Sequence, residues 1–305
     1  PIEGYLIAGI VVGPHTPGFV GDVHLASQLA EVGVILLMFG VGLHFSVQDL
    51  LAVRRIAIPG ALGQSAVATL ACAGIAGLVG WSFHAGLVLG IAVSVASTVV
   101  LLRVLMDNRV LDTAAGHVAL GWLIVEDIIT VLVLVILPTI GGAGTGEDGE
   151  GAGNLWAAIA VAVLKLVALG AVVAFIGARF VPWLLLRVAR FRSRELFTLA
   201  VLVMAIAVAA AAYAVFDASM ALGAFLGGML VGQSRFSHQA GSEILPLRDA
   251  FAVLFFVSTG MLFDFRALFE HPGLVVGTLA VILIAKPLAA FVITILFRHT
   301  VRTAL

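Results

Sequence analysis

Two acidic side chains, Glu126 and Asp127, stand next to each other in the middle of an apolar run that covers residues 121–134. A charge at the centre of a bilayer costs about 2.5–3.5 kcal/mol on insertion scales, so charged residues at that depth usually serve a function. Carboxylate oxygens bind protons, and they are the ligand type that hard cations prefer. The pair therefore predicts a site that binds and releases small cations and protons.

The two carboxylates cannot form one bidentate site, because adjacent residues on a helix point about 100° apart. One of them can face a water-filled cavity while the other pairs elsewhere. Burial favours the protonated form of a carboxylate, and a nearby cation favours the ionised form. A proton and a metal ion can therefore compete for the same oxygens, which is the balance that an exchanger needs.

Further candidate groups lie in other apolar segments. Ser94, Ser97 and Thr98 offer oxygen ligands, although these hydroxyls could equally bond to their own helix backbone. The chain has only two lysines, Lys165 and Lys286, and lysine loses its proton on burial more readily than arginine does. Lys286 is a candidate to compensate the acidic pair. Lys165 is a secondary candidate, since no acidic partner is evident in the sequence, and it could instead snorkel to the interface.

The composition places these residues in a membrane protein with many spans. The chain is 62% hydrophobic and 11% charged, against about 25% charged in soluble domains. A net charge of −1 gives no basis for nucleic-acid binding. The single cysteine, Cys72, rules out a disulfide framework, and no pair of histidines has zinc-site spacing. We expect no cofactor.

A spanning helix needs about 20 mostly apolar residues, and the sequence contains ten apolar segments, of which the first is incomplete and residues 219–233 are short. They cover residues 3–13, 25–44, 56–80, 85–106, 115–139, 155–180, 195–216, 219–233, 245–263 and 273–297. The glycines of residues 219–233 allow close helix approach. Glu31, near the start of the second segment, is assigned to the membrane interface.

Arginines fall in alternate connections between these segments, and only Arg266 breaks the pattern. The arginines on the common side are Arg54, Arg55, Arg103, Arg109, Arg187, Arg190, Arg192, Arg194, Arg235, Arg248, Arg298 and Arg302. The positive-inside rule makes this side cytoplasmic. Residues 187–194 are then a basic cytoplasmic linker, and the Gly-rich residues 140–154 are an exterior one.

Four motifs resemble those of bacterial monovalent cation:proton antiporters, the branch that contains Kef-type potassium efflux systems and sodium/proton exchanger relatives. They are residues 4–14 (GYLIAGIVVGP), residues 31–43 (EVGVILLMFGVGL), the stretch around Glu126 and Asp127, and residues 254–261 (LFFVSTGM). Within this family the chain is most similar to Kef-like proteins that carry a Glu-Asp pair.

The resemblance implies an all-α polytopic fold of inverted repeats in the bacterial inner membrane, which works as a homodimer by an elevator movement. Residues 85–106 match a helix that unwinds and crosses a counterpart in the other repeat. Residues 1–305 would be an incomplete membrane transport domain, because that counterpart should follow residue 297. A possible nucleotide-binding regulatory domain lies outside this chain. The implied parts are scaffold helices in 1–55 and 195–263, a core half with the ion site in 56–139, a linker helix in 155–180, and the start of the second core half in 273–297.

The resemblance also implies roles for the charged residues. Asp127 matches the essential aspartate that binds the cation and the proton. Glu126 sits where relatives carry Asp, Asn or Gln, and it can pair with the lysine that Lys286 matches. The expected function is exchange of a monovalent cation, potassium favoured and sodium possible, for protons, and the chain is not expected to be an enzyme.

Other classes of protein fit the same residues less well. A potassium or cation channel, or a gated efflux pathway of Kef type, is the alternative, but the sequence has neither a T-V-G-Y-G filter nor a charged ring. An intramembrane aspartyl protease needs aspartates on two separate helices. A structural scaffold would not need Glu126, Asp127 and Lys286 at membrane depth, although Glu126 and Lys286 could form a static ion pair.

Overall fold

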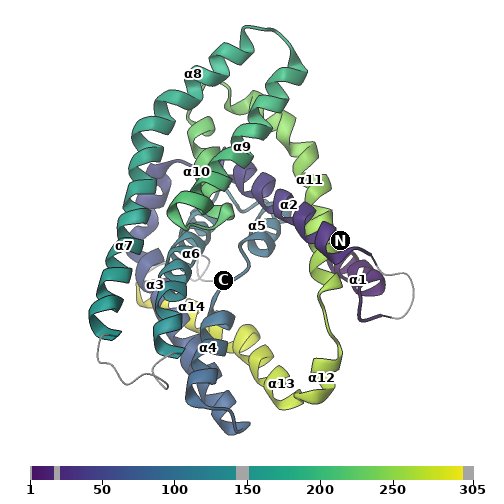
Figure 1. The fold of residues 1–305 in the computed structure, drawn as a ribbon, viewed down its shortest axis with the longest axis vertical. Helices are drawn as coiled ribbons and strands as arrows, with labels where there is room; N and C mark the ends of the chain where they lie inside the picture. Colours follow the sequence, from purple (N-terminus) through teal and green to yellow (C-terminus); the bar gives the residue numbers. More distant parts are fainter. Residues whose placement is uncertain (1, 17–20, 142–150, 298–305) are drawn as a thin grey trace. The chain divides into compact units, whose positions relative to one another are not determined.

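The computed structural model describes residues 2–16, 21–141 and 151–297, and these residues form the all-helical fold that the sequence predicts (Figure 1). The helices are α1 (Ile2–Val12), α2 (Val23–Gly42), α3 (Val47–Leu78), α4 (Phe83–Ser94), α5 (Thr98–Asp107), α6 (Ala114–Gly141), α7 (Gly151–Val172), the π-helix η1 (Val173–Gly177), α8 (Ala178–Ala189), α9 (Arg194–Phe216), α10 (Met220–Gly232), α11 (Ser237–Met261), α12 (Arg266–Glu270), α13 (Pro272–Ala280), the π-helix η2 (Val281–Ala285) and α14 (Lys286–Leu296).

The chain divides into two compact units, and each takes helices from both halves of the sequence. The first unit contains residues 1–47 and 164–265, and the second contains residues 48–163 and 266–305. In the first unit α2 packs against α10 and α11, and α1 packs against α11. The assignment of the first unit as a dimerisation scaffold and of the second as a moving core stays a prediction.

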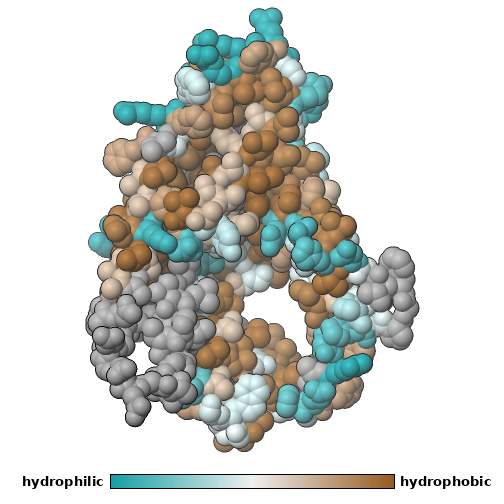
Figure 2. Space-filling view, viewed as in Figure 1, coloured by the Kyte–Doolittle hydropathy of each residue, from teal (hydrophilic) through white to brown (hydrophobic). Residues whose placement is uncertain are grey.

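Six stretches of the described residues are long and apolar enough to cross a membrane, and a seventh is if α7 and α8 count as one bent span. α1 and α10 are shorter apolar helices. In Figure 2 hydrophobic side chains cover most of the face of the first unit, and hydrophilic ones gather where α8 turns into α9. The expected exterior linker, residues 140–154, lies mostly outside the described residues.

Several helices extend beyond the apolar segments that predict them. α3 begins at Val47 rather than at residue 56, α11 begins at Ser237 rather than at 245, and α8 continues to Ala189. Hydropathy marks only the oily part of a helix, whereas backbone hydrogen bonds continue through polar residues until a cap or turn ends them. Arg248 is consequently wrong as a connection residue, because it lies buried within α11 and bonds to Asp249.

Glycines let α2 and α10 cross at backbone contact, as the Gly-rich segment predicted. A Cβ added to Gly228 would collide with the carbonyl oxygen of Phe39, and one added to Gly42 would collide with that of Phe225. Small residues permit such an approach because no side chain separates the two backbones. The close crossing holds two helices of the first unit together.

We expect Gly228→Ala to destabilise the protein by about 1–3 kcal/mol, because the added methyl group must push two backbones apart. Gly170→Ala in α7 is the matched control, since a Cβ there meets no atom within 4 Å. That change should stabilise the helix by about 0.5–1 kcal/mol. Thermal unfolding in detergent measures both variants, and equal midpoints would contradict the crossing.

Candidate functional site

A helix break between α4 and α5 forms the centre of the site, which lies in the second unit. α4 ends at Ser94, and α5 begins at Thr98. Val95 and Ser97 have extended backbone, and the Ser97 hydroxyl caps α5 by accepting from the amide of Val100. The candidate span Phe83–Asp107 therefore consists of two half-helices, which agrees with the unwinding that the resemblance implies for the segment 85–106. Such a break is tolerated at membrane depth only where other groups bond to the freed backbone atoms.

Lys286 bonds to the backbone on the α4 side of this break. Its side chain is buried, at 9% exposure, and its ammonium donates to the carbonyl oxygens of Ser94 at 2.6 Å and Val93 at 3.3 Å. Lys286 directly follows the π-helix η2 and precedes Pro287. Proline lacks an amide proton and clashes with the carbonyl four residues earlier. Pro287 therefore explains why the helix widens locally at η2.

Glu126 bonds to the backbone on the α5 side of the break. Its carboxylate is 2% exposed and accepts one hydrogen bond at 3.0 Å from the amide of Ala96 and one at 3.0 Å from the side chain of Gln64. The backbone oxygen of Glu126 accepts a further bond from the Thr130 hydroxyl. The acidic residue is thus held in a single position by α3, α6 and the broken segment.

The charges at the break match the dipoles of the two half-helices. The C-terminal end of α4 carries partial negative charge, and Lys286 binds its last carbonyls. The N-terminal end of α5 carries partial positive charge, and Glu126 binds an amide beside it. The direct ion pair expected between Glu126 and Lys286 is not formed in the described structure, because each side chain bonds to the broken backbone between them.

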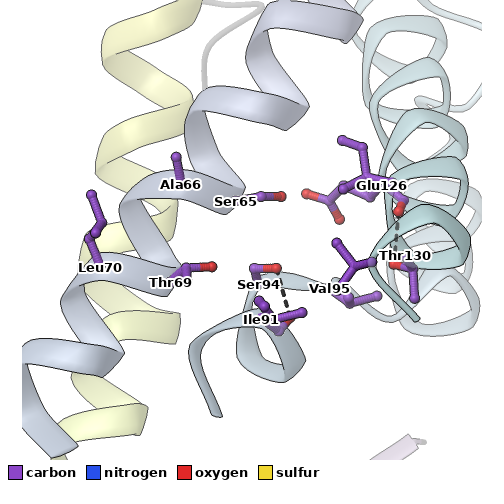
Figure 3. A pocket seen from close by; sticks show the side chains of 11 residues that line it. Ser65, Ala66, Thr69, Leu70, Ile91, Ser94, Val95, Glu126 and Thr130 are labelled. Carbon is purple, nitrogen blue, oxygen red and sulfur yellow. Dashed lines mark hydrogen bonds between the residues drawn. The ribbon is translucent and has the colours of Figure 1, made fainter. Parts of the chain in front are cut away.

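A cavity of about 320 Å³ opens beside this arrangement. Figure 3 shows the Glu126 carboxylate pointing toward the side from which Ser65, Thr69 and Ser94 project. Thr130 lines the same cavity. One carboxylate and four hydroxyls therefore surround a space that could hold a cation and several waters.

Asp127 differs from its neighbour in both position and bonding. Its carboxylate is half-buried and does not line the cavity beside Glu126. No residue in the described ranges makes a hydrogen bond or an ion pair with it. The expected difference in direction is therefore present, but the residue that faces the cavity is Glu126. Asp127 keeps both oxygens free to bind a proton or a cation.

The other predicted residues divide between the two units. Ser94 lines the cavity, whereas Ser97 caps α5 and Thr98 is buried at its start. Lys165 lies in the first unit, where its ammonium pairs at 2.5 Å with Asp217 at the C-terminal cap of α9. Asp217 is thus an acidic partner of Lys165 that was not evident in the sequence. This half-exposed pair belongs to the surface of the first unit.

Gln64, Ser65, Thr69 and Thr130 belong to the site but were not predicted from the sequence. Gln64 could have been predicted, since it is an amide side chain in the middle of the apolar residues 56–80. Buried polar groups are almost always hydrogen-bonded, so a glutamine at that depth implies a polar partner.

We expect Gln64→Leu to destabilise the protein by about 1.5–3 kcal/mol, because it removes a buried hydrogen bond to a carboxylate. Gln28→Leu is the control, since Gln28 is exposed on α2. Thermal unfolding at constant detergent compares the two variants. If both shift the midpoint equally, the bond from Gln64 does not hold Glu126.

Comparison with known proteins agrees with this architecture. The family model described as "Sodium/hydrogen exchanger, transmembrane" matches residues 1–305. The chain is 53% identical over 306 residues to the Putative cation/proton antiporter YbaL of Escherichia coli, covering all of this chain and 54% of that protein. It is 30% identical over 311 residues to K(+) efflux antiporter 4 of Arabidopsis thaliana, covering 99% of this chain and 50% of the relative. The chain thus spans about half the length of these curated relatives.

A solved structure shows the same fold. The sodium proton antiporter MjNhaP1 of Methanocaldococcus jannaschii superposes with a TM-score of 0.57 at 16% identity, covering 99% of this chain and 74% of that chain. The relatives are described as antiporters, which are transporters rather than enzymes, as the sequence indicated. The family and the apolar spans make the chain a multi-span membrane protein, and its bacterial relative agrees with the expected inner-membrane location.

Proposed function

Because the chain belongs to the sodium/hydrogen exchanger family, we propose that it is the transport part of an antiporter that exchanges a monovalent cation for protons. One observation carries the proposal. Asp127 has a half-buried carboxylate with no bonding partner in the described ranges, next to a residue whose carboxylate accepts two hydrogen bonds. A carboxylate held at membrane depth without a partner is suited to bind a proton and a cation in turn.

Potassium is the substrate that we favour, and sodium is the alternative. Relatives that match nearly the whole chain are described as K(+) efflux antiporters, at 28–33% identity. The cavity beside Glu126 presents a carboxylate and four hydroxyls among apolar side chains, and it supports either ion, since hard cations prefer carboxylate and hydroxyl oxygens.

In the mechanism that we infer, Asp127 binds the cation when the site opens to one side of the membrane and a proton when it opens to the other. Lys286 and Glu126 neutralise the ends of α4 and α5, so the break keeps its shape while charge enters and leaves. Movement of the second unit relative to the first, in a homodimer joined through the first, would change the side to which the site opens.

Proton flux in liposomes that contain the whole protein tests this proposal. The vesicle interior is made acidic, and potassium, sodium or lithium chloride is added outside. We expect potassium to dissipate the pH gradient and protein-free vesicles to retain it. A response to sodium alone would identify sodium rather than potassium as the substrate. No response to any cation would contradict exchange.

The channel alternative predicts a different result in the same vesicles. A channel conducts potassium down an imposed electrical potential without moving protons in return. Cation flux recorded with no pH change, at a rate far above carrier turnover, would favour the channel. Flux that occurs only with a matching proton movement supports the exchanger.

A further inference from the structure

A second pocket, of about 270 Å³, lies within the first unit, and its wall combines apolar side chains with a few oxygen-bearing ones. Its oxygen-bearing lining residues are Ser27 and Glu31 from α2 and Ser258 and Thr259 from α11. Met220, the first residue of α10, closes part of the wall. This pocket is separate from the site at the helix break, whose residues all belong to the second unit.

The ends of three helices near this pocket are assigned to the same side of the membrane. α2 and α10 begin close to it, and α11 ends close to it. The alternation of arginines assigns these ends to the exterior side. Glu31 stands eight residues after the start of α2, which corresponds to a depth of about 12 Å along the helix. The pocket therefore opens from the exterior and reaches into the membrane.

Glu31 is a charged group without a visible use in the fold. Its side chain is exposed in the first unit, and none of the described residues gives it a hydrogen bond or an ion pair. An unpaired carboxylate at this depth is costly unless it faces water or a cation. Assignment to the membrane interface, as the sequence suggested, does not explain why three hydroxyls surround it.

The hydroxyl groups of this pocket have lone pairs that are not used in hydrogen bonds within the protein. Ser258 is 3% exposed and makes a long contact of 3.4 Å with Ser27. Thr259 donates to the carbonyl oxygen of Phe255 at 2.8 Å, which leaves its lone pairs available. Each hydroxyl oxygen can therefore still accept a hydrogen bond from a water or contact a cation.

We propose that this pocket binds a monovalent cation, potassium or sodium with part of its hydration shell, from the exterior. A single carboxylate matches a single positive charge, and neutral hydroxyls supply the remaining oxygens. The volume exceeds that of a bare ion, and a water takes about 30 Å³ of liquid, so hydrating waters fit beside it. The identity of the cation rests on the proposed function, but the binding itself does not require transport.

Thermal unfolding of the whole protein in the Asp127→Asn background tests the proposal independently of exchange. Potassium or sodium chloride replaces N-methyl-D-glucamine chloride at constant ionic strength. We expect the midpoint to rise by roughly 2–4 °C once the cation exceeds its dissociation constant about tenfold. The added change Glu31→Gln should abolish that rise.

Asp22→Asn is the matched control, because Asp22 caps the same end of α2 and asparagine caps a helix equally well. The rise should survive this change, and Ser258→Ala should weaken it by raising the cation concentration required. No rise in the Asp127→Asn protein, or an unaltered rise after Glu31→Gln, would overturn the proposal. A loss of transport in Asp127→Asn leaves this outcome unaffected, so the two proposals can fail separately.

Discussion

Asp127→Asn should reduce cation-driven proton flux to the level of protein-free vesicles. The substitution preserves the size of the side chain but removes the negative charge that alternately holds a proton and a cation. Asp127 bonds to no other residue in the described chain, so we expect no loss of stability, and removal of an unpaired buried charge can even raise the unfolding midpoint.

This combination of lost transport and retained stability distinguishes a binding role from a structural one. A structural aspartate would lower the midpoint when it is replaced. Asp112→Asn serves as the control, because Asp112 is exposed in the connection between α5 and α6 of the same unit. It should retain both flux and stability. Exchange that persists in Asp127→Asn at the wild-type rate would refute the assignment of Asp127.

Lys286→Ala should destabilise the protein by about 3–5 kcal/mol, the usual cost of removing one partner from a buried charged arrangement. The ammonium bonds to the carbonyl oxygens of Val93 and Ser94, and alanine would leave these atoms unsatisfied at membrane depth. Glu126 would also lose the nearby positive charge. Exchange should fall in the same variant, because the broken segment would no longer hold its shape.

Lys165→Ala is the matched control, since Lys165 is the only other lysine in the sequence. Its pair with Asp217 is half-exposed, with side-chain exposures of 37% and 63%. Exposed pairs contribute about 0–1 kcal/mol, so this change should alter the midpoint little. Unfolding curves of the two variants in the same detergent make the comparison. Equal midpoints would show that the break does not depend on Lys286.

Contacts between distant residues explain most of the differences between prediction and structure. Glu126 bonds to Gln64 and Ala96, which are 62 and 30 residues away along the chain. Lys286 bonds to Ser94, which is 192 residues away. Hydropathy shows that such groups are at membrane depth, but it carries no information about which of them meet. The predicted pairing of Glu126 with Lys286 was chemically reasonable and differed from the structure only because backbone atoms compete for both charges.

The sequence alone determined the membrane class, the helical spans and the unusual depth of Glu126, Asp127 and Lys286, because these follow from local composition and from the cost of burying charge. Only the tertiary structure decided where the segment 85–106 is interrupted, that Glu126 rather than Asp127 faces the cavity, and that Lys165 pairs with Asp217. The physical reason is that a backbone break and a hydrogen bond depend on which atoms of other helices reach them, and that is settled when the helices pack.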